Sequence, residues 1–146
     1  RTQAQAGGAR GQPMTVRIYG PATTSSLASL VTEGRLTGPV RAHAVTEAQR
    51  AAWPDGDDEG WEYAALMAAA ADSAGLRGPG DAPRRMVLAA DVGAVTPAGG
   101  DDATLVEAAG DLLWKHLASA HVDTVDDAAD DDDLAWYATQ EIPDLV

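Results

Sequence analysis

The 146-residue sequence predicts an α+β protein, a single domain with a mixed sheet of four to five strands and helices mainly on one face. Five short segments have the alternating or β-branched pattern of strands, and segments with helical spacing are interleaved with them. The length fits one domain. No internal repeat of about 20–50 residues is visible, which argues against a solenoid.

The first predicted strand is residues 15–19 (TVRIY), in which β-branched and polar residues alternate before Gly20-Pro21. Residues 27–34 (LASLVTEG) follow, with leucine and valine at helical spacing. Gly34 is a typical residue at the C-terminal end of a helix. These features predict a strand followed by a short amphipathic helix.

A second strand is predicted at residues 39–46 (PVRAHAVT), whose side chains alternate between two faces. A helical turn over residues 46–53 follows it and ends before Pro54. The clearest helical pattern covers residues 59–76, where an alanine-rich stripe allows close packing on a sheet. Acidic residues 57–59 stand at the start of this helix, where the helix dipole favours negative charge.

The second half of the chain contains three more predicted strands and two helical segments. The strand at 84–92 (RRMVLAADV) is apolar enough to lie inside the sheet. Pro143 cannot continue a helix, so it closes the last helical segment. The other elements are strands at 103–109 and 119–123, a helical turn at 112–117 and a helix at 134–141.

The composition predicts a small core surrounded by solvated segments. Leu, Ile, Val and Phe together supply only 25 of the 146 residues, and Phe is absent. The four Trp residues are expected to replace Phe as core bulk. Residues 1–13 have no hydrophobic segment and are predicted to be a disordered leader or a cloning remnant. The predicted domain is 14–146, with a mobile acidic segment at about 124–133.

The charge balance excludes several kinds of partner. Ten basic residues stand against 23 acidic ones, which gives a net charge of −13. Nucleic acids and anionic membranes are bound by clusters of Lys and Arg, so neither is an expected partner. An acidic chain suits a basic protein, or it reflects only the composition of its host. The absence of Cys excludes disulfides and thiolate metal sites.

Residues 55–60 (DGDDEG) resemble the start of an EF-hand calcium loop, with oxygen-bearing side chains at the first, third and fifth positions and Gly at the sixth. The twelfth position needs a bidentate Glu and is Leu66. An acidic cluster at a helix start is the simpler interpretation, so no metal site is predicted. No glycine-rich nucleotide motif is present either, and the sequence predicts no cofactor.

Two acidic segments support the leading hypothesis, a non-catalytic binding or regulatory module that presents an acidic surface to a basic partner protein. One is the start of the helix at 59–76. The other belongs to a run with seven Asp between Asp123 and Asp133. Binding through such charges weakens as salt rises. The candidate partner-binding residues are Asp55, Asp57, Asp58, Glu59, Glu62, Asp126, Asp127, Asp130 and Asp131.

The alternative hypothesis is a small hydrolase or transferase. His121 and Asp123 are two residues apart on a predicted strand and therefore share a face. Tyr137 and Glu141 are four residues apart on a predicted helix and also share a face. A His with a carboxylate can perform acid–base catalysis. This hypothesis requires all four side chains to converge in one pocket.

Several short segments, taken in chain order, resemble a family of short acidic actinobacterial proteins of unknown function. They are VRIYGPAT, AHAVT, EYAA, VLAADV, AHVD and the tail WYATQEIPDL. The resemblance extends from Met14 to Val146, and residues 136–143 are its most specific part. It implies a cytoplasmic bacterial protein and no particular activity.

Overall fold

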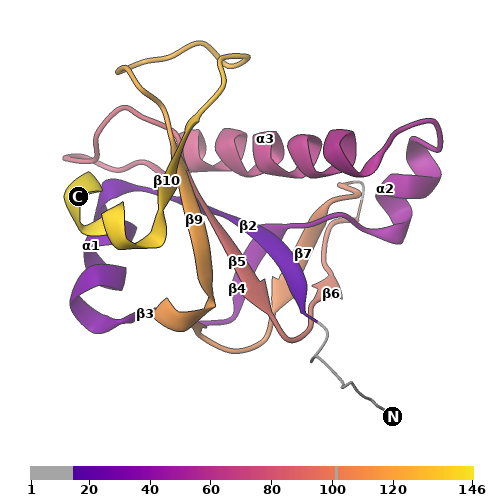
Figure 1. Cartoon of the computed structure of the whole chain (residues 1–146), viewed down its shortest axis with the longest axis horizontal. Coiled ribbons are helices and arrows are strands. Elements are labelled where there is room, and N and C mark those ends of the chain that lie inside the picture. Colours follow the sequence, from indigo (N-terminus) through magenta and orange to yellow (C-terminus); the bar gives the residue numbers. More distant parts are fainter. Residues whose placement is uncertain (1–14, 101) are drawn as a thin grey trace.

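The computed structural model describes residues 15–100 and 102–146, so the predicted leader at 1–13 lies outside the described residues. Figure 1 shows one sheet with a long helix lying across it. The strands of this sheet are β2 (Val16–Ala22), β4 (Val40–His43), β5 (Met86–Val92), β6 (Thr96–Pro97), β7 (Leu105–Ala108), β9 (Leu117–Val122) and β10 (Ala135–Ala138). Their spatial order is β10–β9–β5–β2–β4–β7–β6.

Five further elements connect these strands. The α-helices are α1 (Thr24–Glu33), α2 (Glu47–Ala52) and α3 (Asp58–Leu76), and the 3₁₀ helices are η1 (Trp114–His116) and η2 (Thr139–Leu145). A separate two-stranded sheet pairs β3 (Arg35–Leu36) with β8 (Leu112–Leu113).

The α+β class that the sequence predicts is confirmed, but two finer predictions are wrong. The main sheet has seven strands rather than four to five. Each pairing between neighbouring strands is antiparallel, so the described sheet is not mixed. The two additional strands are β6 and β10. β6 has only two residues, which is too short for a detectable alternating pattern, and the sequence predicts a helix at the position of β10.

The centre of the sheet is formed by β2 and β5. All seven residues of β5 pair with β2, and its other edge pairs with β9, so the apolar segment at 84–92 lies inside the sheet as predicted. β4 and β5 are each antiparallel to β2 and therefore run in the same direction. α2 and α3 connect them, which places α3 across one face of the sheet.

The face under α3 is packed with small side chains. Ala65, Ala69 and Ala70 of α3 are fully buried against Tyr19 and against Val87 and Ala89 of β5. Alanine allows a helix to approach a sheet closely, so the predicted alanine stripe is the contact surface of this helix. α3 is thereby fixed directly above β2 and β5.

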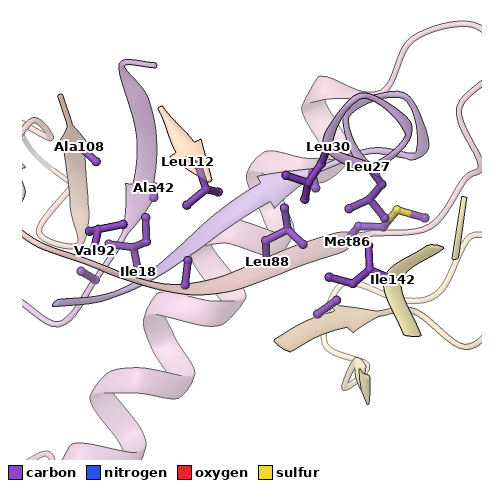
Figure 2. Packing of buried hydrophobic residues seen from close by; sticks show 14 of the residues in the cluster. Ile18, Leu27, Leu30, Ala42, Met86, Leu88, Val92, Ala108, Leu112 and Ile142 are labelled. Atoms are coloured by element: carbon purple, nitrogen blue, oxygen red, sulfur yellow. The ribbon is translucent and has the colours of Figure 1, made fainter. Parts of the chain in front are cut away.

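The opposite face carries the larger core cluster. Leu27 and Leu30 of α1 and Ile142 of η2 belong to one buried cluster with Ile18 and Leu88 of the sheet, and Figure 2 shows them beside Met86 and Leu88. The prediction of helices mainly on one face is therefore wrong, because α3 covers one face while α1 and η2 cover the other. β5 is buried on both of its faces, which explains why its sequence is a continuous apolar run.

The tail is a strand rather than the predicted helix at 134–141. β10 pairs antiparallel with β9, with Trp136 opposite His121 and Tyr137 opposite Ala120. Only the following residues, in η2, are helical. A short segment has weak helical preference of its own, so pairing with a preceding strand overrides it.

The expectation that the four Trp supply core bulk is also wrong. Trp136 is 62% exposed and Trp53 is 47% exposed, whereas Trp114 only packs partly against the larger cluster. The largest fully buried hydrophobic side chains are aliphatic, among them Ile18, Leu27 and Leu88. Close packing of α3 through alanine leaves little space beneath the helix, and the aromatic side chain buried there is Tyr19.

Asp81 fixes the loop before β5 to the start of α1. Its carboxylate accepts hydrogen bonds from the backbone N–H groups of Ser25 (2.9 Å) and Gly78 (2.8 Å) and from the hydroxyls of Ser25 and Thr24. These bonds, first of all the one from the Ser25 hydroxyl, lower the pKa of Asp81 to about 2. They favour the charged form, so the loop contact is pH-dependent.

We predict that this contact stabilises the fold above about pH 4 and that the stabilisation disappears as pH falls towards 2, because the folded pKa lies below the unfolded one. The measurement is urea unfolding of the wild type and Asp81→Asn between pH 7 and 2. The difference in the free energy of unfolding between wild type and Asp81→Asn should shrink as pH falls from 7 to 2. Asp144→Asn, at the exposed end of η2, is the control. A difference that persists unchanged to pH 2 would contradict this account.

Candidate functional site

An open groove of about 760 Å³ lies between α3 and the strands β2, β9 and β10. It occupies the part of the α3 face that the alanine contact leaves uncovered, near the N-terminal half of the helix. This α3 groove is lined by Arg17, Tyr19, Asp57, Glu59, Gly60, Glu62, Tyr63, Leu66, Ser119, His121 and Trp136.

The floor of the α3 groove contains Arg17, which forms an ion pair with Asp91. Arg17 of β2 stands opposite Asp91 of β5. Its guanidinium donates to both carboxylate oxygens, Nε to Oδ1 at 2.7 Å and Nη2 to Oδ2 at 3.1 Å. The hydrogen bond to Asp91 raises the pKa of Arg17 despite partial burial. Because this bidentate pair occupies the fork of the guanidinium, the carboxylate of Asp91 offsets part of the positive charge of Arg17.

A tyrosine–carboxylate contact joins α3 to the sheet. The hydroxyl of Tyr19 donates to Oε1 of Glu62 at 3.1 Å. Burial and then the neighbouring Glu62 raise the pKa of Tyr19 to about 12. Tyr19 is therefore a neutral hydrogen-bond donor at physiological pH.

β9 and β10 contribute a histidine, a serine and a tryptophan to the wall of the groove. Nε2 of His121 lies 3.2 Å from the hydroxyl of Ser119, two residues earlier on the same face of β9. Trp136 is the cross-strand partner of His121. Burial, and secondarily the positive charge of Arg17, lower the pKa of His121. The imidazole is therefore neutral at pH 7, and the charge of the groove is set by its carboxylates.

We predict that His121 titrates below pH 6.5 in the folded protein, because burial disfavours the imidazolium. The measurement is an NMR titration of its ring protons. Arg17→Gln should move the midpoint upward, since it removes a nearby positive charge. A midpoint at or above 6.5 in the wild type would contradict the described burial.

The groove collects part of the predicted acidic surface. Asp57, Glu59 and Glu62 line it, and all three are exposed. The side chain of Asp57 also accepts from the N–H of Gly60 at 2.8 Å and so caps α3. Asp58 lines a smaller adjoining pocket of about 250 Å³. Asp55 is exposed in the turn between α2 and α3.

The remaining predicted residues lie in the connection between β9 and β10, which extends past α3 at the top of Figure 1. Arg84 pairs with Asp126 at 2.7 Å, and the N–H of Asp127 donates to the carbonyl of Pro83. Asp130 and Asp131 are exposed. The mobility predicted for 124–133 stays a prediction, but the segment is attached to the body at several points.

A buried ion pair organises that same connection. Arg85 and Asp123 have side chains only 5% and 2% exposed and are joined by two hydrogen bonds, of 2.8 and 2.9 Å. The guanidinium of Arg85 also donates to the carbonyl oxygens of Asp130 and Asp132. Arg85 therefore fixes the course of the acidic segment from inside the protein.

The acidic segment and α3 are in direct contact. The hydroxyl of Tyr63, on α3, donates to Oδ1 of Asp133 at 2.8 Å. Tyr63 also lines the α3 groove. The two parts of the predicted acidic surface therefore meet along one side of the helix.

The four side chains of the enzyme hypothesis are not brought together. His121 lines the α3 groove, whereas Tyr137 packs against the core cluster on the opposite face of the sheet. Both carboxylate oxygens of Asp123 accept hydrogen bonds from Arg85. Glu141 accepts a hydrogen bond from the N–H of Ala138 at 2.8 Å. Strand alternation explains the separation, since Trp136 rather than Tyr137 shares a face with His121.

Sequence reasoning missed seven residues of the groove, of which five have polar or aromatic side chains. Arg17 and Tyr19 flank Ile18 on a predicted strand, so their shared face was readable from alternation. Trp136 was missed because the sequence predicts a helix at 134–141, whereas Trp136 lies on the strand β10. No sequence pattern marks Ser119 or Tyr63 as a site residue. Ser119 reaches the groove through the pairing of β9 with β5 and β10, and Tyr63 reaches it through the placement of α3.

A family model matches residues 16–130 and is described as a family of unknown function, DUF6912. This range covers most of the chain, so the protein belongs to that family. The matched range ends before the tail motif at 136–143. Searches of curated proteins and of solved structures gave no significant match.

Two features are absent from residues 15–100 and 102–146, the described part of the chain. No helix in this part of the chain is long and apolar enough to cross a membrane. Within the same residues, no group of three or more His, Asp or Glu side chains is arranged to hold a metal ion.

Proposed function

We propose that this protein is a non-catalytic cytoplasmic binding module that presents an acidic surface to a basic partner protein. The surface consists of the start of α3 with Asp57, Asp58, Glu59 and Glu62 and the acidic segment at 124–133. The observation that carries the proposal is the meeting of these two parts through Tyr63 and Asp133.

The charges on this surface are largely uncompensated, which supports the proposal. Among the described residues, neither Glu59 nor Glu62 forms a salt bridge, and Glu62 accepts only from the neutral hydroxyl of Tyr19. The nearby arginines at 17, 50, 84 and 85 are each paired with an acidic side chain, and Arg50 pairs with Glu47 of its own helix. An uncompensated negative surface attracts a positively charged partner and steers its approach.

The proposal is tested by affinity capture from a lysate of the native host, at low and high salt. Wild-type protein is compared with Glu59→Gln/Glu62→Gln and with the control Glu33→Gln/Asp144→Asn, which removes the same charge from α1 and η2. A basic protein should be recovered at low salt by wild type and control, and lost with the α3 variant or at high salt. Equal recovery by all three proteins, or recovery of no basic protein, would contradict the proposal.

A further inference from the structure

We infer that the α3 groove binds a short segment of the basic partner and accepts an arginine or lysine side chain between its aromatic and acidic walls. The aromatic wall is Trp136 and Tyr63, and the acidic wall is Glu59 and Glu62. This inference rests on the proposed function. It assigns to the groove the contact that makes binding of the basic partner specific.

The aromatic wall is unusually exposed for its size. Trp136 is 62% exposed and Tyr63 is 49% exposed, and both line the same groove although they come from β10 and α3. Exposed Trp and Tyr gathered at one place are typical of binding sites. A guanidinium or ammonium over such a ring is attracted by its negative face, and Trp is the strongest partner.

The acidic wall selects the sign of the ligand. Glu59 and Glu62 are exposed carboxylates one helical turn apart, so both project from the same side of α3. The one cation on the floor, Arg17, is held by Asp91, and His121 is neutral. The described lining therefore repels an anionic side chain and favours a cationic one.

The size of the groove indicates a peptide segment rather than a single free ion. Its volume of about 760 Å³ lies within the range of about 300–1,000 Å³ that holds ligands of drug size, which corresponds to a few residues. A long cationic side chain also has an apolar stem, which suits the aromatic wall and Leu66. The groove is open, so the segment can enter from the side.

The test is an NMR titration of the ¹⁵N-labelled full chain with the peptide acetyl-Ala-Arg-Gly-Arg-Ala-amide. Its counterpart with citrulline in place of both arginines keeps the shape and loses the charge. The four tryptophan indole N–H signals are site-specific reporters. We expect the Trp136 signal to shift with the arginine peptide, while that of Trp114, against the core on the opposite face, stays unchanged.

Two variants and one control locate the binding. Glu59→Gln/Glu62→Gln and, separately, Trp136→Ala should each weaken binding of the arginine peptide by about three- to tenfold, as expected for partly exposed charge and cation–π contacts. Glu33→Gln/Asp144→Asn, with the same charge loss as the first variant, should change it by less than about twofold.

Several results would overturn this inference. They are equal binding of the citrulline peptide, shifts spread over all four indole signals, equal weakening by the control, or no binding. If the α3 variant still loses the captured basic protein while the groove signals do not respond to the arginine peptide, the proposed function stands and only the role of the groove fails. If no basic protein is captured, the proposed function fails as well.

Discussion

Asp123→Ala is expected to lower the free energy of unfolding by about 3–5 kcal/mol, the typical cost of removing one partner from a buried ion pair. Its carboxylate accepts from the guanidinium and from the backbone N–H of Arg85. Without it, the charge of Arg85 stays buried and unpaired. Chemical denaturation at pH 7 measures the loss, and far-UV circular dichroism shows whether the variant still folds.

The control for this variant is Asp126→Ala, three residues later. Asp126 also pairs with an arginine, Arg84, but the side chains are 60% and 38% exposed. Exposed pairs contribute only about 0–1 kcal/mol, so the control should unfold almost like wild type. Similar losses in the two variants would show that the Arg85 pair is not buried as described.

Leu88→Ala is expected to cost about 2–5 kcal/mol, because it removes a large side chain from the interior without filling the space. Leu88 is 2% exposed and lies at the middle of β5, inside the larger core cluster (Figure 2). Few other aliphatic side chains are available to close the cavity, since the composition is poor in them. The midpoint of urea unfolding measures the change.

Leu76→Ala is the matched control for the core variant. Leu76 is the last residue of α3 and is 60% exposed, so its truncation should change stability by less than about 0.5 kcal/mol. A loss for Leu88→Ala no larger than this would mean that β5 is not at the centre of the core.

The elements predicted well from sequence are those whose pattern and end signals agree. α3 has a capping aspartate, Asp57, and a continuous alanine stripe, and α1 ends at Gly34 with a φ of 76°. β5 is apolar on both faces because helices cover both sides of the sheet. In these segments local preference and tertiary packing favour the same structure.

The elements predicted poorly depend on contacts between distant segments. β10 becomes a strand through pairing with β9, which local spacing does not encode. That error also misplaced Trp136, assigned to the core and found exposed in the groove. Strand pairing determines which of Trp136 and Tyr137 faces His121, so the groove could not be assembled from sequence alone.

The most direct measurement of the central claim is a backbone NMR map of the ¹⁵N-labelled chain with the basic protein that it captures. If the acidic surface is the binding site, resonances of residues 57–66 and 124–136 shift on addition of the partner, and the shifts decrease as salt rises. Residues 24–33 of α1 and 139–145 of η2, on the opposite face of the sheet, stay unchanged. Shifts confined to α1 and η2, or shifts that high salt leaves intact, would contradict the account.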